Sequence, residues 1–233
     1  MITRRQFLQH VGAGAAVSLL PSCTRARMHG SGRKRPNIII IYMDDLALGD
    51  VGVFGCPDPG TENIDSLARD GVKLSNAYTI NAPCCPSRTG LMMGMYTQRF
   101  GKYDLSRGVP IPDDKATLAE TLRDAGYTTG IVGLEKWDIG RWDQGCLDRG
   151  FMEAGMHPPR AKGMEGFGGG AAYRSINGSY LTENEGAYVL DFLDRHGHDD
   201  KPFFMYFVPL AIHVPHIEVP EKYLKRLYPD HTG

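Results

Sequence analysis

This chain has no excess charge of one sign. Its 233 residues include 26 Lys and Arg against 27 Asp and Glu, so the formal net charge is −1. Proteins that bind nucleic acid usually carry a basic patch, and this balance gives no sign of one. Hydrophobic residues make up 42% of the chain, which is enough for one globular domain with a sizeable core.

Cysteine is scarce, and its spacing excludes the common zinc modules. No C-x-x-C pair occurs, and no other zinc-ligand spacing is present. Two of the five cysteines are adjacent in the chain. The five are Cys23, Cys56, Cys84, Cys85 and Cys146.

The apolar run near the N-terminus, residues 11–20, is too short to span a bilayer. Arg4-Arg5 precedes it, which is typical of a twin-arginine export signal. The following Leu-Pro-Ser-Cys resembles a bacterial lipobox, which would make Cys23 a lipid anchor; ordinary signal-peptidase cleavage nearby is the alternative. We therefore expect an export signal over 1–23, a basic linker over 24–35 and a folded domain over 36–233. This organisation predicts a periplasmic protein or a cell-surface lipoprotein of a bacterium.

Hydrophobic patterning indicates alternating strands and helices. A continuous apolar run predicts a strand buried on both faces of a parallel sheet, and Thr117 with Glu120 has the spacing of a capping box. Pro86 fits a first helical turn, so Cys84 is expected at or just before a helix N-terminus. The predicted strands cover 37–43, 127–132 and 203–208; the predicted helices cover 61–70, a segment from about 84, a segment from 118, and 182–195; residues 154–179 are predicted to form a loop.

These elements predict an α/β fold with a mostly parallel central sheet flanked by helices. Polar residues follow three of the strands: Asp44-Asp45, Lys136 and His213. Ligands of such sheets sit beyond the carboxyl ends of the strands. We therefore expect these residues to converge on one crevice.

Asp44 and Asp45 are adjacent carboxylates at the end of a predicted strand. Paired carboxylates offer the hard oxygen ligands that Ca²⁺ and Mg²⁺ prefer. A solvated acidic turn is the alternative that the pair alone leaves open.

The stretch from Cys84 reads Cys-Cys-Pro-Ser-Arg-Thr-Gly-Leu-Met-Met-Gly. It resembles the sulfatase signature C-x-P-S-R-x-x-L-x-T-G, with Met93 in place of the usual Thr. The segment from Pro36 to Asp50 is similar to the first segment of that family, in which paired aspartates bind Ca²⁺. Further similarities, including Arg149-Gly150-Phe151, extend the resemblance over 36–233. It implies an alkaline phosphatase-like fold and hydrolysis of sulfate esters.

The resemblance assigns a role to each motif residue. Cys84 would be oxidised to formylglycine by a maturation enzyme and would then attack the sulfur of the ester. One hydroxyl of the hydrated aldehyde displaces the alcohol, and the other loses its proton so that elimination expels sulfate. Asp44 and Asp45, with the modified Cys84, would bind Ca²⁺, and Arg88 would support the formylglycine and the metal-site geometry.

Two later segments resemble the family with departures. Gly-Leu-Glu-Lys-Trp-Asp at 133–138 matches the family's G-K-W-H with two inserted residues and with Asp138 replacing His. Lys136 would bind a sulfate oxygen, and Asp138 would accept a hydrogen bond in place of the family's His. His213, two residues before Pro215, matches the His that contacts the sulfate and protonates the leaving alcohol.

The family's later S-D-N-G segment, a further Lys and the C-terminal subdomain have no counterpart in the chain. We therefore expect the N-terminal part of a sulfatase catalytic domain that is inactive by itself. The expected substrate is a sulfated small molecule or glycan, a choice that export alone supports. Two alternatives stay open: a phosphoesterase or phosphonate hydrolase of the same superfamily, and an inactive truncated remnant.

Overall fold

The computed structural model describes residues 34–57, 60–104, 109–133, 146–155, 180–209, 211–212 and 219–230. The chain divides into two units, residues 1–35 and residues 36–233. The expected export signal over 1–23 lies outside the described residues, and so does the expected linker except for its last two residues. Within the described ranges, no helix is long and apolar enough to cross a membrane.

Four strands form one sheet in the order β1-β4-β2-β3, and every neighbouring pair is parallel. β4 therefore lies between the first two strands of the chain, and Phe207 is the register partner of both Ile41 and Val132. The predicted α/β class with a parallel sheet is confirmed. The strands are β1 (Ile38–Ile41), β2 (Thr128–Gly133), β3 (Glu153–Gly155) and β4 (Phe203–Val208).

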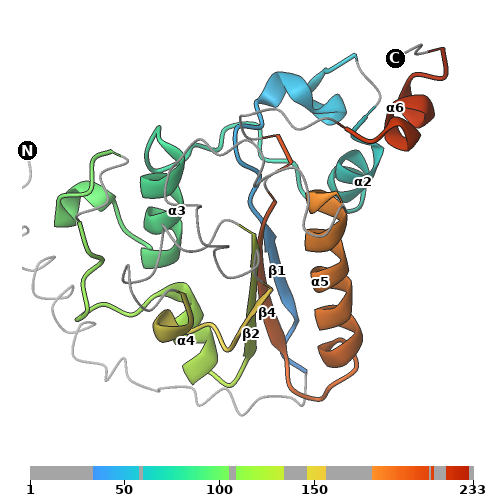
Figure 1. The fold of residues 1–233 in the computed structure, drawn as a ribbon. Helices are drawn as coiled ribbons and strands as arrows, with labels where there is room; N and C mark the ends of the chain where they lie inside the picture. Colours follow the sequence, from blue (N-terminus) through green and yellow to red (C-terminus); the bar gives the residue numbers. More distant parts are fainter. Residues whose placement is uncertain are drawn as a thin grey trace, which may run out of the picture. The chain divides into compact units, whose positions relative to one another are not determined.

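Helices flank both faces of this sheet. α3 and α4 lie on one side of it and α5 lies on the other (Figure 1). The α-helices are α2 (Glu62–Asp70), α3 (Cys84–Met93), α4 (Leu118–Asp124), α5 (Leu181–His196) and α6 (Glu221–Leu227), and the 3₁₀ helices are η1 (Leu48–Asp50), η2 (Gly52–Phe54), η3 (Thr97–Phe100) and η4 (Cys146–Arg149).

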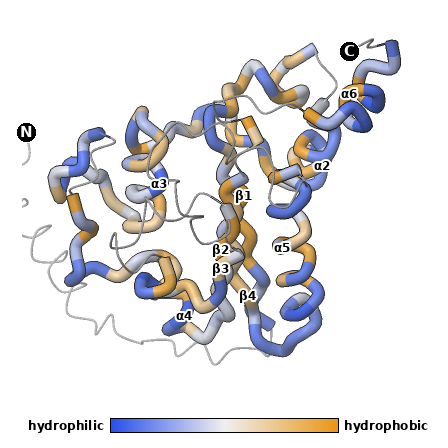
Figure 2. The backbone as a smooth tube through the Cα atoms, viewed as in Figure 1, coloured by the Kyte–Doolittle hydropathy of each residue, from blue (hydrophilic) through white to orange (hydrophobic). Residues whose placement is uncertain are grey.

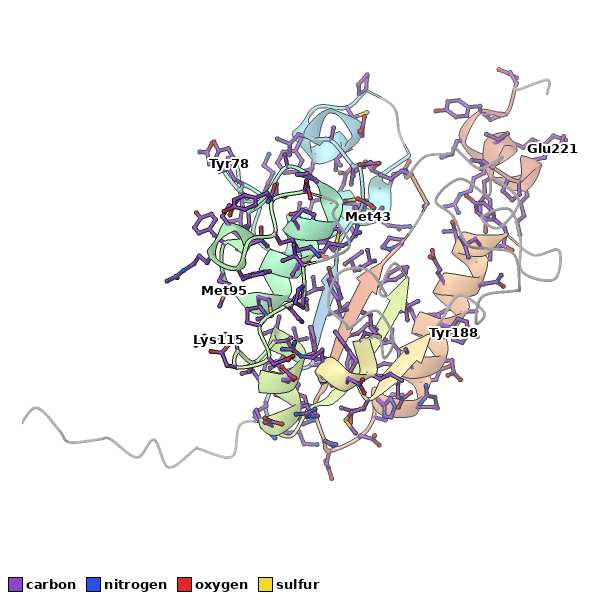
Figure 3. The ribbon with its side chains drawn as sticks, turned by 60° about the vertical axis from the view of Figure 1, so that its left-hand side comes forward. Met43, Tyr78, Met95, Lys115, Tyr188 and Glu221 are labelled. Carbon is purple, nitrogen blue, oxygen red and sulfur yellow. The ribbon has the colours of Figure 1, made fainter. Side chains whose placement is uncertain are left out.

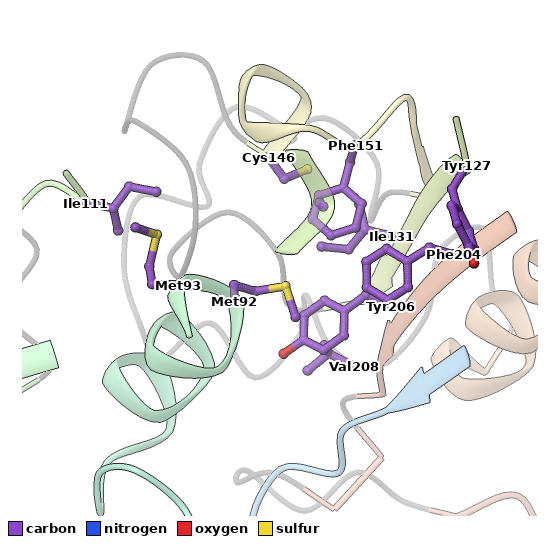
Figure 4. Packing of buried hydrophobic residues seen from close by; sticks show 11 residues of the cluster. Met92, Met93, Ile111, Tyr127, Ile131, Cys146, Phe151, Phe204, Tyr206 and Val208 are labelled. Carbon is purple, nitrogen blue, oxygen red and sulfur yellow. The ribbon is translucent and has the colours of Figure 1, made fainter. Parts of the chain in front are cut away.

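The core is built on the two-residue alternation of β4. Phe204 and Tyr206 pack with Met92 of α3 in the cluster of Figure 4. Phe203 and Met205 belong to a second cluster, which includes α5. The sequence of β4, Phe-Phe-Met-Tyr-Phe-Val, is accordingly mostly apolar (Figure 2). β2 and β4 are buried on both faces.

The continuous apolar run over 37–43 predicts a strand buried on both faces, and this prediction is wrong for β1. Its residues alternate between half-buried and exposed, and the side chains of Ile39 and Ile41 are 46% and 52% exposed. β1 is an edge of the described sheet, and the described elements leave one of its faces uncovered. On α2 the apolar side chains of Ile64 and Leu67 are likewise exposed, at 38% and 66%. Patterning identified both elements correctly, but not what packs against them.

The predicted loop 154–179 begins too early. Residues 154 and 155 belong to β3, which pairs with Gly130–Val132 of β2. Three residues containing Ala and Gly carry no strand periodicity, so only the neighbouring strand defines this one. The rest of the predicted loop, 156–179, lies outside the described residues.

The capping box at Thr117 is confirmed. Its Oγ1 accepts a hydrogen bond from the Glu120 backbone N–H at 3.0 Å, and Oε2 of Glu120 accepts one from the Thr117 N–H at 2.7 Å. These bonds satisfy two backbone donors at the start of α4.

Candidate active site

The carboxyl ends of three strands meet at one edge of the sheet. Gly133, the last residue of β2, is the register partner of Val208, the last residue of β4, and β1 ends beside them. Gly133 has φ of +103°, and a Cβ there would lie 1.8 Å from the carbonyl oxygen of Val208. Only glycine fits this close approach. Because β2 and β4 both end here, the chain toward Lys136 and the chain toward His213 both leave the sheet at this edge.

Cys84 is the first residue of α3, as predicted. Pro83 before it is extended, and the N–H of Ser87 donates a 3.1 Å hydrogen bond to the carbonyl of Pro83. Cys84 is half-buried. The positive end of the helix dipole lies at this residue, where it favours an anion such as sulfate.

Two side-chain bonds join α3 to the segment that follows β1. Nη1 of Arg88 donates to Oδ2 of Asp44 at 2.8 Å, and both residues are buried. The hydroxyl of Tyr42 lies 2.7 Å from Oγ of Ser87. Met43, between the two partners, lies beyond the end of β1 (Figure 3).

The sequence spacing of these residues explains why the two hydrogen bonds can form together. Ser87 and Arg88 are three and four residues after Cys84, so all three occupy one face of α3. Tyr42 and Asp44 are two residues apart, which places them on one side of an extended segment. The face of α3 that carries Cys84 is thereby held against the segment that carries the aspartates.

Asp45 adopts a left-handed conformation with φ of 58°, the only non-glycine residue among those described to do so. This conformation is uncommon outside glycine, although Asp and Asn tolerate it best. It breaks the alternation by which neighbouring residues of an extended segment point to opposite sides. Asp45 is exposed, in contrast to Asp44.

The donor chemistry of this pair suits a hard cation. Two carboxylates are oxygen ligands of the kind that Ca²⁺ binds, but Ca²⁺ takes six to eight oxygens. In the part of the chain that the structure describes, no group of three or more His, Cys, Asp or Glu side chains could hold a metal ion. The aspartates therefore fit Ca²⁺ in kind and would supply only part of its coordination shell.

Among the predicted site residues, the structure brings Arg88 of α3 into contact with Asp44 after β1. Cys84 lies one helical turn before Arg88, and Asp45 follows Asp44 in the chain. Lys136, Asp138 and His213 lie outside the described residues. Two contact residues, Tyr42 and Ser87, escaped the sequence analysis. Ser87 is part of the Cys-Cys-Pro-Ser-Arg motif, and Tyr42 lies within the predicted strand 37–43, so neither pattern assigns a contact.

Comparisons with known proteins point to one family. The family model described as Sulfatase matches residues 36–230. The chain is 31% identical to N-acetylgalactosamine-6-sulfatase of Canis lupus familiaris over 88% of the chain and 45% of that protein. It is 39% identical to N-acetylgalactosamine-6-O-sulfatase of Bacteroides thetaiotaomicron over 53% of the chain and 25% of that protein.

Solved structures show the same fold. The crystal structure of Ps i-CgsB in complex with k-i-k-neocarrahexaose has a TM-score of 0.68 at 28% identity, covering 85% of this chain and 49% of that one. A phosphonate monoester hydrolase of Agrobacterium radiobacter has a TM-score of 0.58 at 21% identity, which is a likeness of fold alone. The chain thus spans about half the length, or less, of the relatives it matches.

Proposed function

The chain belongs to the sulfatase family, and we propose that the protein hydrolyses sulfate esters, with Cys84 converted to formylglycine as the nucleophile. The observation that carries this proposal is the position of Cys84. It begins α3, one helical turn from Arg88, whose guanidinium holds the buried Asp44 at 2.8 Å. Nucleophile position, anion-favouring helix terminus and carboxylates thus occur in one place.

A formylglycine at position 84 supplies a geminal diol, one hydroxyl to attack sulfur and the other to drive elimination of sulfate. Asp44 and Asp45 would hold Ca²⁺, which lowers the pKa of a nearby hydroxyl and offsets developing negative charge. Arg88 orients Asp44 through their hydrogen bond. The N-terminus of α3 orients the anionic group toward position 84.

Lys136 and His213 complete the proposed site. Both follow strands that end at the same sheet edge, Lys136 three residues after Gly133 and His213 five residues after Val208. Lys136 would bind a sulfate oxygen, and His213 would protonate the leaving alcohol. Asp138 would accept a hydrogen bond in place of the family's His.

The proposed substrate is a sulfated carbohydrate. The relatives named above are sulfatases of N-acetylgalactosamine, one similar structure holds a neocarrahexaose, and another, with a TM-score of 0.59, holds D-glucosamine-2-N,6-O-disulfate. We also propose export, directed by residues 1–23, with Cys23 as the candidate lipid anchor. A formylglycine-generating enzyme would be the maturation partner.

The test is peptide mass spectrometry and an aryl sulfate assay of the full protein from a host that has the maturation enzyme. Tryptic cleavage after Lys73 and Arg88 isolates residues 74–88. Conversion of Cys84 lowers the mass of this peptide by about 18 Da, because CH₂SH becomes CHO. C85A should keep the conversion and turnover of an aryl sulfate, whereas C84A should lose both. Unconverted Cys84, or turnover by C84A equal to that of the wild type, contradicts the proposal.

A further inference from the structure

We propose that Tyr42 is a positioning residue for the nucleophile at position 84. The inference rests on the proposed function, since it takes position 84 as the reacting residue. Tyr42 does not belong to the motif. It acts through Ser87, whose Oγ lies 2.7 Å from the Tyr42 hydroxyl, one helical turn from Cys84.

The sheet fixes Tyr42 before its hydroxyl meets Ser87. Its backbone N–H donates a 2.8 Å hydrogen bond to the carbonyl of Phe207, which continues the pairing of β1 with β4. Its ring packs edge-on against Tyr206, with centroids 6.5 Å apart at an interplanar angle of 60°. A hydroxyl on so constrained a ring has little freedom, so its bond defines where Ser87 lies.

A second hydrogen bond, from Arg88 to Asp44, joins the same two segments. One bond between a helix and a neighbouring segment leaves the helix able to turn about that contact. Two bonds, from neighbouring residues of the helix to Tyr42 and Asp44, fix its rotation. Cys84 lies on the same face as both helix residues, so this rotation sets the direction in which the nucleophile points.

The hydroxyl has no packing role of its own. A Phe ring at position 42 would keep the contact with Tyr206 and fill nearly the same volume. Ser87 is 4% exposed, so its hydroxyl would lose a partner that water does not readily replace. Y42F therefore removes the positioning bond and little else, and S87A removes it from the other side.

The kinetic test compares Y42F, S87A and the double variant in the full protein, matured and assayed on an aryl sulfate. We expect kcat to fall about tenfold or more, with KM within about twofold, because misplacement by about 1 Å costs on the order of 10²-fold. The double variant should be no slower than the slower single one, because both changes remove the same bond. Y223F is the matched control: its hydroxyl donates a 2.7 Å bond to Glu183 on another face of the protein.

Amide hydrogen exchange gives a readout that does not need activity. Loss of about 1 kcal/mol of local stability predicts roughly fivefold faster exchange at Ser87 and Arg88 in Y42F, and unchanged exchange there in Y223F. An active wild type with Y42F kcat within twofold, or unchanged exchange at residues 87–88, overturns the role of Tyr42. A wild type that is converted at Cys84 yet turns over no sulfate ester counts against the proposed function instead.

Discussion

Nη1 of Arg88 and Oδ2 of Asp44 lie 2.8 Å apart, and their side chains are 3% and 4% exposed. Burying either charge alone would cost several kcal/mol, so each depends on the other. The pair joins the motif helix to the proposed metal-binding segment. Asp44 thus has a structural role in addition to any role as a metal ligand.

The first prediction follows from this pair. D44N removes the charge of Asp44 from its buried pair with Arg88, and we expect it to lower the free energy of unfolding by roughly 3–5 kcal/mol. D45N, at an exposed position, should change it by less than about 0.5 kcal/mol. Urea unfolding measures both.

Equal changes in the free energy of unfolding of D44N and D45N would show that the buried pair of Asp44 and Arg88 does not stabilise the fold. The comparison also decides how metal binding should be tested. D44A would lose Ca²⁺ binding both because the fold is destabilised and because a ligand is removed. D45N would lose Ca²⁺ binding only because a ligand is removed.

The second prediction concerns the end of β2. In G133A the new Cβ meets the Val208 carbonyl oxygen at 1.8 Å, and φ of +103° is itself unfavourable for alanine. Neither backbone can move without breaking strand pairing, so we expect a loss of more than about 3 kcal/mol in the free energy of unfolding. G186A is the matched control, because Gly186 lies inside α5 with nothing within 4 Å of an added Cβ.

The control should stabilise the protein by up to about 1 kcal/mol, since alanine is the better helix former. Thermal unfolding of the two variants therefore moves in opposite directions. A G133A protein as stable as the wild type would mean that the strand end relaxes away from β4.

The third prediction is that Glu120 contributes to the stability of the protein at neutral pH and that this contribution is lost in acid. Burial raises its pKa, but hydrogen bonds from Arg149 and from Thr117, with the charge of Arg149, outweigh this and hold the pKa below the ordinary 4.5. A carboxyl with a lowered folded-state pKa stabilises the protein above its unfolded-state pKa. This contribution is lost as the pH falls below about 4.5, through the folded-state value.

E120Q should therefore be less stable than the wild type at pH 7, and the difference should shrink as the pH falls below 4.5. Denaturant unfolding at several pH values measures it. E62Q, at an exposed position on α2, controls for the loss of one negative charge. A constant difference between E120Q and the wild type at every pH would contradict the assignment.

Arg149 shows where the sequence was understood only in part. The family resemblance of Arg149-Gly150-Phe151 gives these residues no role. In the structure Arg149 is buried and donates to Glu120 and to the carbonyl of Lys115. Phe151 stacks on Phe204 in the core. These partners lie about thirty residues or more away in the chain, and no local pattern identifies them.

Local signals predicted what depends on local physics. The capping box gave the start of α4, and the proline of the motif gave the start of α3, because both concern neighbouring residues. The bond of Tyr42 to Ser87 spans 45 residues and depends on how the helix lies against the sheet. Pattern analysis therefore named the residues proposed to carry the chemistry and missed Tyr42, the residue proposed to position one of them.

The last prediction concerns His213 as the acid for the leaving group. An alkoxide is a poor leaving group and needs a proton in the transition state, whereas an activated phenolate leaves without one. H213A should therefore lower kcat for a sugar sulfate far more than for an activated aryl sulfate. K136A is the comparison variant. If Lys136 binds a sulfate oxygen common to both substrates, it should slow both by a similar factor, on the order of 10²-fold.

The ratio of kcat for the aryl sulfate to kcat for the sugar sulfate separates proton donation from sulfate binding. A general loss of folding or of metal lowers kcat for both substrates together and leaves this ratio unchanged. H213A should change that ratio by roughly 10²-fold or more, in line with the usual contribution of a general acid. K136A should leave it near the wild-type value. Equal losses on both substrates in H213A would remove His213 from the acid role and leave it as a sulfate-binding residue like Lys136.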